Sequence, residues 1–204
     1  YLEEVRGILD LARNYSFTEK KDGYELWKEP VGVVACLTPW NYPLGQITQK
    51  IFPALVTGNV VLLKPSGQTP LVAYKITEAL HAAGLPAGVF QLITGKGSQV
   101  GNLFAEHPGI DMVTFTGSTA AGKKVAARAG DDVKRVILEL GGKSPALVLE
   151  GADLSVAVKK TLNTVLGNVG QTCSAFTRLI APRSMKQDVE DALLERLKVY
   201  KVGD

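Results

Sequence analysis

The sequence predicts an α/β protein with an open parallel sheet covered by helices on both faces, followed by the start of a second α/β domain. Three observations support this prediction. Short apolar runs rich in β-branched residues alternate with stretches of helical periodicity. The run Val60–Lys64 is apolar up to its last residue, as expected of a strand buried on both faces. The alternation changes its rhythm after Gly141-Gly142, so we expect a domain boundary there.

The order of the elements supports the same architecture. Strands are expected at residues 31–38, 60–64, 89–93, 112–116 and 135–139, and helices at residues 1–14, 44–56, 69–83, 99–105 and 118–128. Helical crossovers between successive strands imply a parallel sheet of the open, Rossmann-like type. Beyond Gly141 we expect a strand at 144–149, a helix at 153–166 capped by Asp153, and a helix at 184–200.

These elements define three segments. Residues 1–30 form a lead-in helix and strand, residues 31–140 form the sheet domain, and residues 141–204 form the N-terminal part of a second, truncated domain. The chain begins with Tyr1 inside a predicted helix and stops shortly after another helix. We therefore expect a segment of a longer polypeptide, whose targeting signals, if any, lie outside it.

Composition and charge exclude several classes of protein. A hydrophobic content of 46% with 21% charged residues is ordinary for a globular protein with a real core. The net charge of +3 is spread along the chain without a basic block, which argues against nucleic-acid and membrane-surface partners. No apolar run approaches the roughly 18 to 20 residues of a membrane span. Cys36 and Cys173 are far apart, which argues against a disulfide scaffold or zinc site and favours a reducing compartment.

The carboxyl ends of the strands are the expected ligand edge, because helix N-termini there point positive dipole ends at phosphates. Gly95-Lys96-Gly97 resembles a glycine-rich phosphate loop, but its spacing is not GxGxxG and an ordinary turn explains it equally well. In Phe115-Thr116-Gly117-Ser118, Gly117 would allow close backbone approach and Ser118 could offer a hydroxyl to a phosphate. An ordinary helix N-cap is the alternative for Ser118.

Three further residues are candidates for catalysis. Asn41 follows the first strand and could present an amide donor to a developing oxyanion, or simply form a turn. Glu139 ends the fifth strand and could act as a general base, or be a solvated strand-end residue. Cys173 is flanked by small and polar residues and is either a reactive thiol or a small buried side chain. Cys36, inside an apolar strand, is expected to be a core residue.

Taken together, five motifs resemble the aldehyde dehydrogenase superfamily in their order and spacing, from residue 31 to the C-terminus. They are Thr38-Pro39-Trp40-Asn41-Tyr42-Pro43, Lys64-Pro65-Ser66, Phe115-Thr116-Gly117-Ser118, Glu139-Leu140-Gly141-Gly142-Lys143 and Gly170-Gln171-Thr172-Cys173. The resemblance implies that an aldehyde is oxidised to a carboxylic acid with hydride transfer to NAD(P). It also implies a route through a cysteine thiohemiacetal and a thioester that water hydrolyses.

The resemblance assigns the catalytic roles residue by residue. It makes Cys173 the nucleophile and Glu139 the base that activates the hydrolytic water. It makes Asn41 the oxyanion donor, together with the backbone N–H of Cys173. It links Lys50, as a buried lysine, to proton transfer. Relatives that pass the acyl group to coenzyme A commonly lack a glutamate at position 139, so its presence favours hydrolysis. A CoA-acylating or semialdehyde-phosphorylating enzyme and a non-catalytic nucleotide-binding protein remain the alternatives.

The resemblance also implies a cofactor site and no metal. Lys64 is implied to contact the adenosine ribose, and Trp40 and Ser118 the pyrophosphate. The remaining cofactor residues that we expect are Ser66, Gly67, Gly117, Leu140 and Gly141. Many NAD-preferring relatives carry a glutamate where this chain has Gly67. Without that carboxylate nothing repels a 2′-phosphate, and we predict that NADP is accepted or even preferred over NAD.

Partners are expected to be a small-molecule aldehyde and further copies of the chain. The full-length protein is expected to be a cytoplasmic homodimer or homotetramer that binds neither nucleic acid nor membrane. Phe176 is expected either to line the substrate tunnel or to pack in the core. The identity of the aldehyde is not encoded in these residues. Expressed alone, the chain is expected to show little activity and to expose apolar surface.

Overall fold

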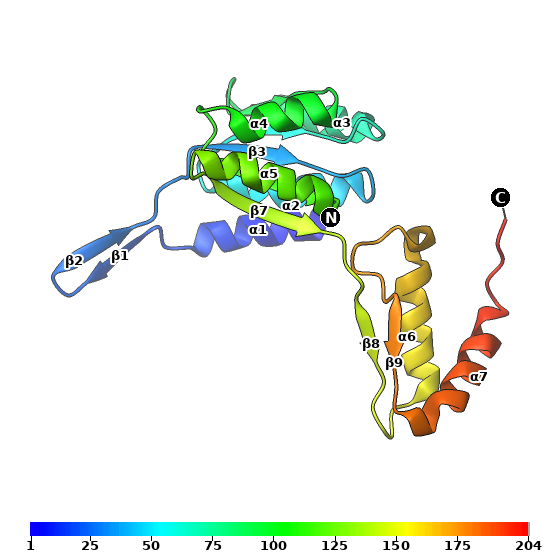
Figure 1. Cartoon of the computed structure of the whole chain (residues 1–204). Helices are drawn as coiled ribbons and strands as arrows, with labels where there is room; N and C mark the ends of the chain where they lie inside the picture. The colour runs from blue at the N-terminus through cyan, green and yellow to red at the C-terminus, as the bar shows by residue number, and fades with distance from the viewer. Residues whose placement is uncertain (204) are drawn as a thin grey trace. The chain divides into compact units, whose positions relative to one another are not determined.

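The computed structural model of the chain describes residues 1–203. The chain divides into two compact units, Tyr1–Leu140 and Gly141–Asp204. The first unit holds residues 1–30 together with the large sheet, and the second holds a small sheet and two helices. Figure 1 labels helices and strands of both units.

The first unit is built on a five-stranded sheet whose strands all run parallel. The strands are β3 (Val33–Leu37), β4 (Val60–Lys64), β5 (Phe90–Leu92), β6 (Met112–Gly117) and β7 (Arg135–Leu140). Their order in the sheet is β5-β4-β3-β6-β7. The chain therefore winds outward from β3 in one direction and from β6 in the other, which places a topological switch point between these two strands. The predicted open parallel sheet is confirmed.

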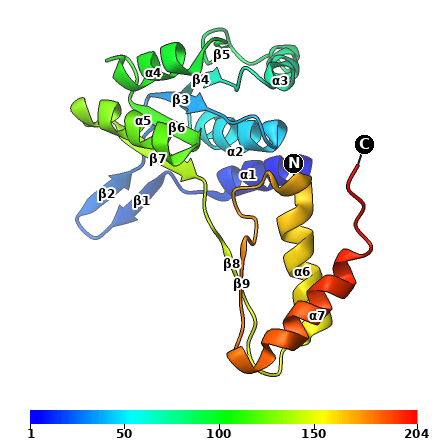
Figure 2. The same cartoon turned by 45° about the vertical axis from the view of Figure 1, so that its right-hand side comes forward.

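Helices cover both faces of this sheet (Figure 2). Helices α2 (Pro43–Val56) and α3 (Pro70–Ala82) lie on one face, and α4 (Asn102–Glu106) and α5 (Thr119–Asp131) on the other. Side chains of a strand alternate between the faces, so β3 sends Val34 and Cys36 into the core under α2 and sends Ala35 and Leu37 into the core under α5. Both faces are apolar because both are buried.

Residues 1–30 contain a helix and two strands, where the sequence led us to expect one strand. Helix α1 (Leu2–Asn14) packs beside α2. A hairpin of β1 (Thr18–Lys21) and β2 (Tyr24–Trp27) follows, closed by the two-residue turn Asp22-Gly23. Gly23 has φ of +81°, a conformation that glycine adopts without strain. Asp-Gly between two strands is a strong hairpin signal in a sequence.

The second unit contains the parallel pair β8 (Pro145–Leu147) and β9 (Arg178–Ile180), with helix α6 (Leu154–Leu166) in the connection between them. Helix α7 (Lys186–Leu197) follows, after a short turn of 3₁₀ helix at Arg183–Met185. Asp153 caps α6, because its carboxylate accepts a hydrogen bond from the Val156 N–H at 3.2 Å. The expected helix at 184–200 is thus shorter at both ends, and the expected strand at 144–149 is shorter too.

Two further features concern the helices and the loop after β5. In residues 1–203, no helix combines the length and the apolar character needed to cross a bilayer. The helix expected at 99–105 begins as a wide π turn, Gly97–Gly101, before α4. Gly95, with φ of +148°, lies in the loop between β5 and this turn, so the glycines near residue 95 serve a turn.

Candidate active site

The carboxyl ends of the parallel strands bring the predicted residues of the first unit to one edge of the sheet. Asn41 lies between β3 and α2, Lys64 is the last residue of β4, and Ser118 follows β6. Glu139 is the next-to-last residue of β7 and pairs in register with Thr116 of β6. Residues from four strands therefore share the edge at which open parallel sheets bind ligands, although 98 residues of sequence separate Asn41 from Glu139.

Asn41 lies at the start of α2, where the chain turns sharply from strand to helix. Tyr42 has φ of +52° and precedes Pro43, the first residue of the helix. Proline suits that position because the first helical N–H has no partner within the helix. The Asn41 side chain is half-buried, while Trp40 is more exposed. The turn thus fixes an amide-bearing side chain at the switch point.

Lys64 is buried at the end of β4, and only 6% of its surface is exposed. Its Nζ donates a hydrogen bond to the Pro65 carbonyl oxygen at 2.9 Å. Burial lowers the pKa of Lys64, since the charged form loses water. An ammonium group with two further donor positions at this edge is suited to ribose or phosphate oxygens.

Ser66 and Gly67 form the turn between β4 and α3. The Ser66 hydroxyl accepts a hydrogen bond from the Gln68 N–H at 3.3 Å. Gly67 is exposed, and a Cβ added there would meet nothing within 4 Å. Space for a larger side chain exists at position 67, so glycine there is not required by packing.

Gly117 and Ser118 join β6 to α5, and each has a local structural reason. A Cβ on Gly117 would come within 2.5 Å of the Phe115 ring, so the position excludes side chains. The Ser118 hydroxyl accepts a hydrogen bond from the Ala121 N–H at 3.2 Å and caps α5. Ser118 is nevertheless exposed at the N-terminus of a thirteen-residue helix, where an anion is favoured.

Glu139 is exposed on β7, on the face of the sheet opposite to Leu140. Leu140 packs against Gly122 of α5, where an added Cβ would lie 2.6 Å from a Leu140 methyl carbon. The pair explains why α5 carries a glycine in its second turn. Leu140 therefore has a packing role in this unit, whereas Glu139 presents its carboxylate to solvent.

Lys50 extends from α2 toward the same face as Glu139. Its Nζ donates a hydrogen bond to the Thr114 hydroxyl of β6 at 3.1 Å. Burial lowers the pKa of Lys50, opposed by the nearby Cys36 and Glu139 groups. Cys36 is fully buried beside it, and burial raises the pKa of its thiol to about 12. Cys36 is thus a neutral core residue, as the sequence indicated.

Two threonines complete this face and were not singled out from the sequence. Thr116 pairs with Glu139, and Thr38 directly follows the Leu37–Phe115 pair, so the register carries it beside Thr116. Both hydroxyls are buried, and neither has a hydrogen-bond partner among the described residues. Buried hydroxyls are usually paired, so this corner of the switch point is built for a polar group. The signal in the sequence that could have found them is a polar residue at alternate positions of an otherwise apolar strand, as in β6.

In the second unit, Cys173 lies in an exposed turn between the end of α6 and β9. A Cβ added to Gly142 would lie 3.6 Å from the Cys173 carbonyl oxygen, so these two segments run side by side. Arg178 reinforces the arrangement, because its Nε donates to the Lys143 carbonyl at 2.8 Å. Gly141, at the start of this unit, is exposed. The segment after Glu139 and Leu140 thus continues alongside the cysteine turn.

The approach to Cys173 is unusual in its backbone. Asn168, Val169 and Gly170 all have positive φ, at 51°, 58° and 75°. A left-handed β-branched residue such as Val169 is strained by about 1–2 kcal/mol. Phe176 is half-buried just beyond the cysteine. The run of left-handed residues turns the chain between the end of α6 and the exposed thiol.

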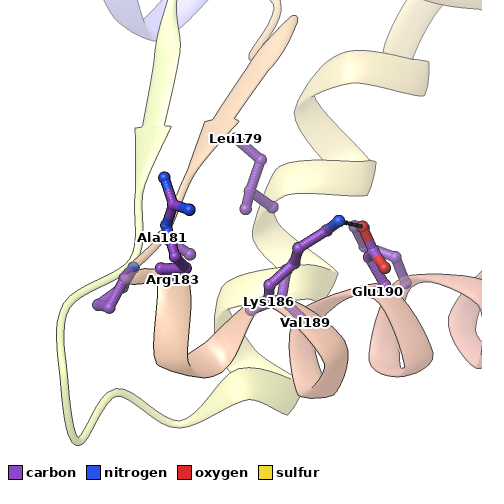
Figure 3. Close-up of a pocket in the computed structure, with 8 residues that line it drawn as sticks. Leu179, Ala181, Arg183, Lys186, Val189 and Glu190 are labelled. Carbon is purple, nitrogen blue, oxygen red and sulfur yellow. Dashed lines mark ion pairs between the residues drawn. The ribbon is translucent and has the colours of Figure 1, made fainter.

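The second unit also contains a cavity of about 620 Å³ (Figure 3). It is lined by apolar and charged side chains of β9, the connection after it and α7, with an ion pair between Lys186 and Glu190 at 3.7 Å. None of the predicted site residues lines it. Within residues 1–203, no group of three or more His, Cys, Asp or Glu side chains is placed to hold a metal ion.

Comparison with known proteins shows the family of the chain. The sequence model of the Aldehyde dehydrogenase family matches residues 3–204. A 3-succinoylsemialdehyde-pyridine dehydrogenase of a Pseudomonas species is 44% identical over 194 residues, covering 95% of this chain and 41% of that protein. The chain spans between 41% and 43% of the length of the curated relatives compared with it.

Solved structures share the fold. Aldehyde dehydrogenase C of Pseudomonas syringae, a mutant crystallised with NAD+ and octanal, is 46% identical with a TM-score of 0.95, over 99% of this chain and 42% of that one. Betaine aldehyde dehydrogenase of Staphylococcus aureus, in complex with NAD+, is 38% identical with a TM-score of 0.93, over 100% and 42%. With its parallel sheet, its strand-end motifs and a family match along almost its entire length, the chain belongs to the aldehyde dehydrogenase family.

Proposed function

We propose that the protein containing this chain oxidises an aldehyde to a carboxylic acid, with Cys173 as nucleophile and NAD(P) as hydride acceptor. The observation that carries the proposal is the sheet edge, where Asn41, Lys64, Ser118 and Glu139 lie at the carboxyl ends of four neighbouring strands. The family membership supplies the reaction class. The chain spans less than half of its relatives, so the activity is that of the whole protein.

The chemistry follows from the residue types. The Cys173 sulfur attacks the carbonyl carbon as a thiolate, and the carbonyl oxygen becomes negative. The Asn41 amide and the backbone N–H of Cys173 donate hydrogen bonds to this oxygen. A donor of this kind contributes about 10²–10³ in rate. Sulfur also suits the later step, because the resulting thioester has a good leaving group.

Glu139 is proposed to take a proton from the water that hydrolyses the thioester, which returns Cys173 to its free form. Its exposed carboxylate on β7 is open to solvent, as a base that uses water must be. Gly142, which lies against the Cys173 carbonyl, is only three residues further along the chain.

The described residues fit a dinucleotide. NAD(P), when bound, supplies the acceptor for the hydride. Lys64 would contact the ribose, and Ser118 and Trp40 the pyrophosphate, with Ser66, Gly67 and Gly117 around them. The exposed start of α5 favours a phosphate. The buried hydroxyls of Thr38 and Thr116, which have no hydrogen-bond partner within residues 1–203, offer polar atoms at the switch point. Two solved relatives that share this fold hold NAD+. Leu140 and Gly141 are proposed to border the same site.

We further propose that NADP is accepted or even preferred over NAD, because Gly67 leaves space and supplies no carboxylate at this turn. The Gly67→Glu variant tests this. A carboxylate there repels a 2′-phosphate and can hold the ribose hydroxyls, so kcat/KM for NADP should fall about tenfold or more while that for NAD is kept. A wild-type enzyme that strongly prefers NAD would contradict the proposal.

For the substrate, the oligomer and the compartment, the proposal names only broad classes. Two solved relatives differ in substrate, one crystallised with octanal and the other named for betaine aldehyde, so only the aldehyde class is proposed here. Phe176, half-buried beyond the cysteine, is proposed to line the substrate path. A homodimer or homotetramer in the cytoplasm is also proposed, and the two free cysteines support a reducing compartment.

The test is a substrate screen of the full-length protein. A panel of aldehydes is assayed with NAD and with NADP, and acid formation is measured with and without coenzyme A. The proposal expects cofactor reduction and free acid without coenzyme A. Product that forms only with coenzyme A would favour the acylating alternative. No cofactor reduction with any aldehyde would favour a non-catalytic protein.

A further inference from the structure

Thr114 is a buried polar residue in the middle of the apolar strand β6. Only 6% of its surface is exposed, and its neighbours in register are Cys36 and Ile137. Its hydroxyl accepts the hydrogen bond that the Lys50 Nζ donates at 3.1 Å. Packing alone would favour valine at such a position, because valine has the same shape and no hydroxyl to desolvate. The hydroxyl therefore serves Lys50.

Lys50 is held under the sheet by its own helix. Ile47 and Ile51, on the same helix, are fully buried against the strands. Burial lowers the pKa of Lys50, and the hydrogen bond to Thr114 opposes this, because a hydroxyl oxygen stabilises the charged ammonium more than the neutral amine. The ammonium would otherwise be an expensive group to bury.

The groups that face Lys50 identify its charge partner. Cys36 of β3, Thr114 of β6 and Glu139 of β7 are those whose interactions reach it. The Cys36 thiol, with its pKa raised to about 12, stays neutral at physiological pH. Among residues 1–203, Glu139 is then the negative group whose charge favours the charged form of Lys50. Because Glu139 is exposed, water screens this attraction partly.

We propose that Thr114 is a positioning residue that keeps the Lys50 ammonium charged and fixed below the end of β7, where its charge holds the Glu139 carboxylate in place for thioester hydrolysis. This rests on the proposed function, since it assigns Glu139 to the hydrolytic step. The three side chains that it involves, Thr114, Lys50 and Glu139, all belong to the first unit. Thr114 touches neither substrate nor water in this scheme, and it acts through Lys50.

The test compares Thr114→Val, which removes the acceptor and keeps the shape, with Thr114→Ser, which keeps the acceptor. The rate after the first acylation burst is measured in the full-length enzyme between about pH 6 and pH 11. Losing the acceptor makes Lys50 lose its proton at lower pH. The alkaline limb of this rate should therefore move down by about one unit in Thr114→Val and stay unchanged in Thr114→Ser.

A second comparison shows whether Thr114 acts through Lys50. In Lys50→Met the alkaline limb should disappear, and adding Thr114→Val should change nothing more. Equal shifts in Thr114→Val and Thr114→Ser, or further loss in the double variant, would overturn the proposal. The KM for the dinucleotide should stay unchanged in Thr114→Val, since a general loss of structure would raise it.

A readout independent of activity separates this inference from the proposed function. The titration of Lys50 itself is followed by NMR of the ¹⁵N-lysine-labelled chain, with Lys50→Met to assign the signal. Thr114→Val should lower the Lys50 pKa by about one unit whether or not the enzyme turns over. An unchanged titration overturns the proposal. If the Lys50 pKa shifts in Thr114→Val but the pH profile of the hydrolytic rate does not, the link to Glu139 is overturned. If the wild-type enzyme shows no acylation burst, the result counts against the proposed function alone.

Discussion

The two units of the chain differ in how many of their residues are buried and in which of the predicted catalytic residues they contain. The first unit has a five-stranded sheet with a core on each face. The second has a two-stranded sheet and two helices, and its buried residues are Val148, Val158, Thr161, Leu162, Ala175 and Val189. The predicted base and oxyanion donor lie on the well-packed unit, whereas the predicted nucleophile lies in an exposed turn of the sparsely packed one.

The two cysteines show the same difference. Cys36 is fully buried in the first unit, and its thiol has a raised pKa, so it is an inert core residue. Cys173 in the second unit is exposed. The raised pKa of the buried Cys36 thiol and the exposure of Cys173 favour Cys173 as the nucleophile. Four sets of variants test these differences between the units.

The largest effect is expected for Cys173→Ser. A hydroxyl is a far weaker nucleophile than a thiolate near neutral pH, so NAD(P) reduction in the full-length enzyme should fall by at least about a thousandfold. Steady-state cofactor reduction at saturating aldehyde is the measurement. The matched control is Cys36→Ala, which should stay within a few fold of wild type. Full activity in Cys173→Ser would end the assignment of the nucleophile.

Glu139→Gln should slow the enzyme in a different way. The amide cannot take a proton from water, so steady-state turnover should fall by about 10²–10⁴ while one equivalent of cofactor is still reduced in a burst. Stopped-flow absorbance of the reduced cofactor separates the two phases. Glu78→Gln, on the exposed surface of α3, is the control and should behave as wild type. Loss of the burst together with turnover would assign Glu139 to acylation instead.

Two core substitutions compare the packing of the units directly. Ile51→Ala removes a fully buried side chain from the first unit, and Leu162→Ala removes one from the second, where it is 5% exposed. We expect a loss in free energy of unfolding of about 4 kcal/mol for Ile51→Ala and about 2 kcal/mol for Leu162→Ala, because a sparse core collapses around a cavity more easily. Urea denaturation of the chain measures both. Equal losses would show that the second unit is packed as tightly as the first.

The smallest effects are expected from the two helix caps. Ser118→Ala removes the cap of α5 and Asp153→Ala the cap of α6, and each should cost about 1 kcal/mol of stability. If Ser118 also contacts the pyrophosphate, only Ser118→Ala should weaken dinucleotide binding, by about fivefold. Isothermal titration of NAD and NADP into the full-length protein measures this. Equal affinity in both variants would leave Ser118 with the cap alone.

Much of the fold was predictable from local signals. The strand Val60–Lys64 was predicted with the bounds that the structure has, because a strand buried on both faces reads as a continuous apolar run. The cap at Asp153 was predicted because a carboxylate before a helix satisfies a free N–H. The hairpin closed by Asp22-Gly23 was missed, since its strands are polar and exposed and only the turn marks them.

The parallel sheet, the family and the residues at the strand ends could be predicted from the sequence, because periodicity, turn residues and motif order are local properties of the chain. Which side chains share a face became visible only in the folded chain. The fold brought Lys50 onto Thr114 across 64 positions, and it buried the hydroxyls of Thr38 and Thr116, which have no hydrogen-bond partner in the described part of the chain. Such neighbours depend on strand order and register, which are set by how the whole sheet packs and not by any one segment.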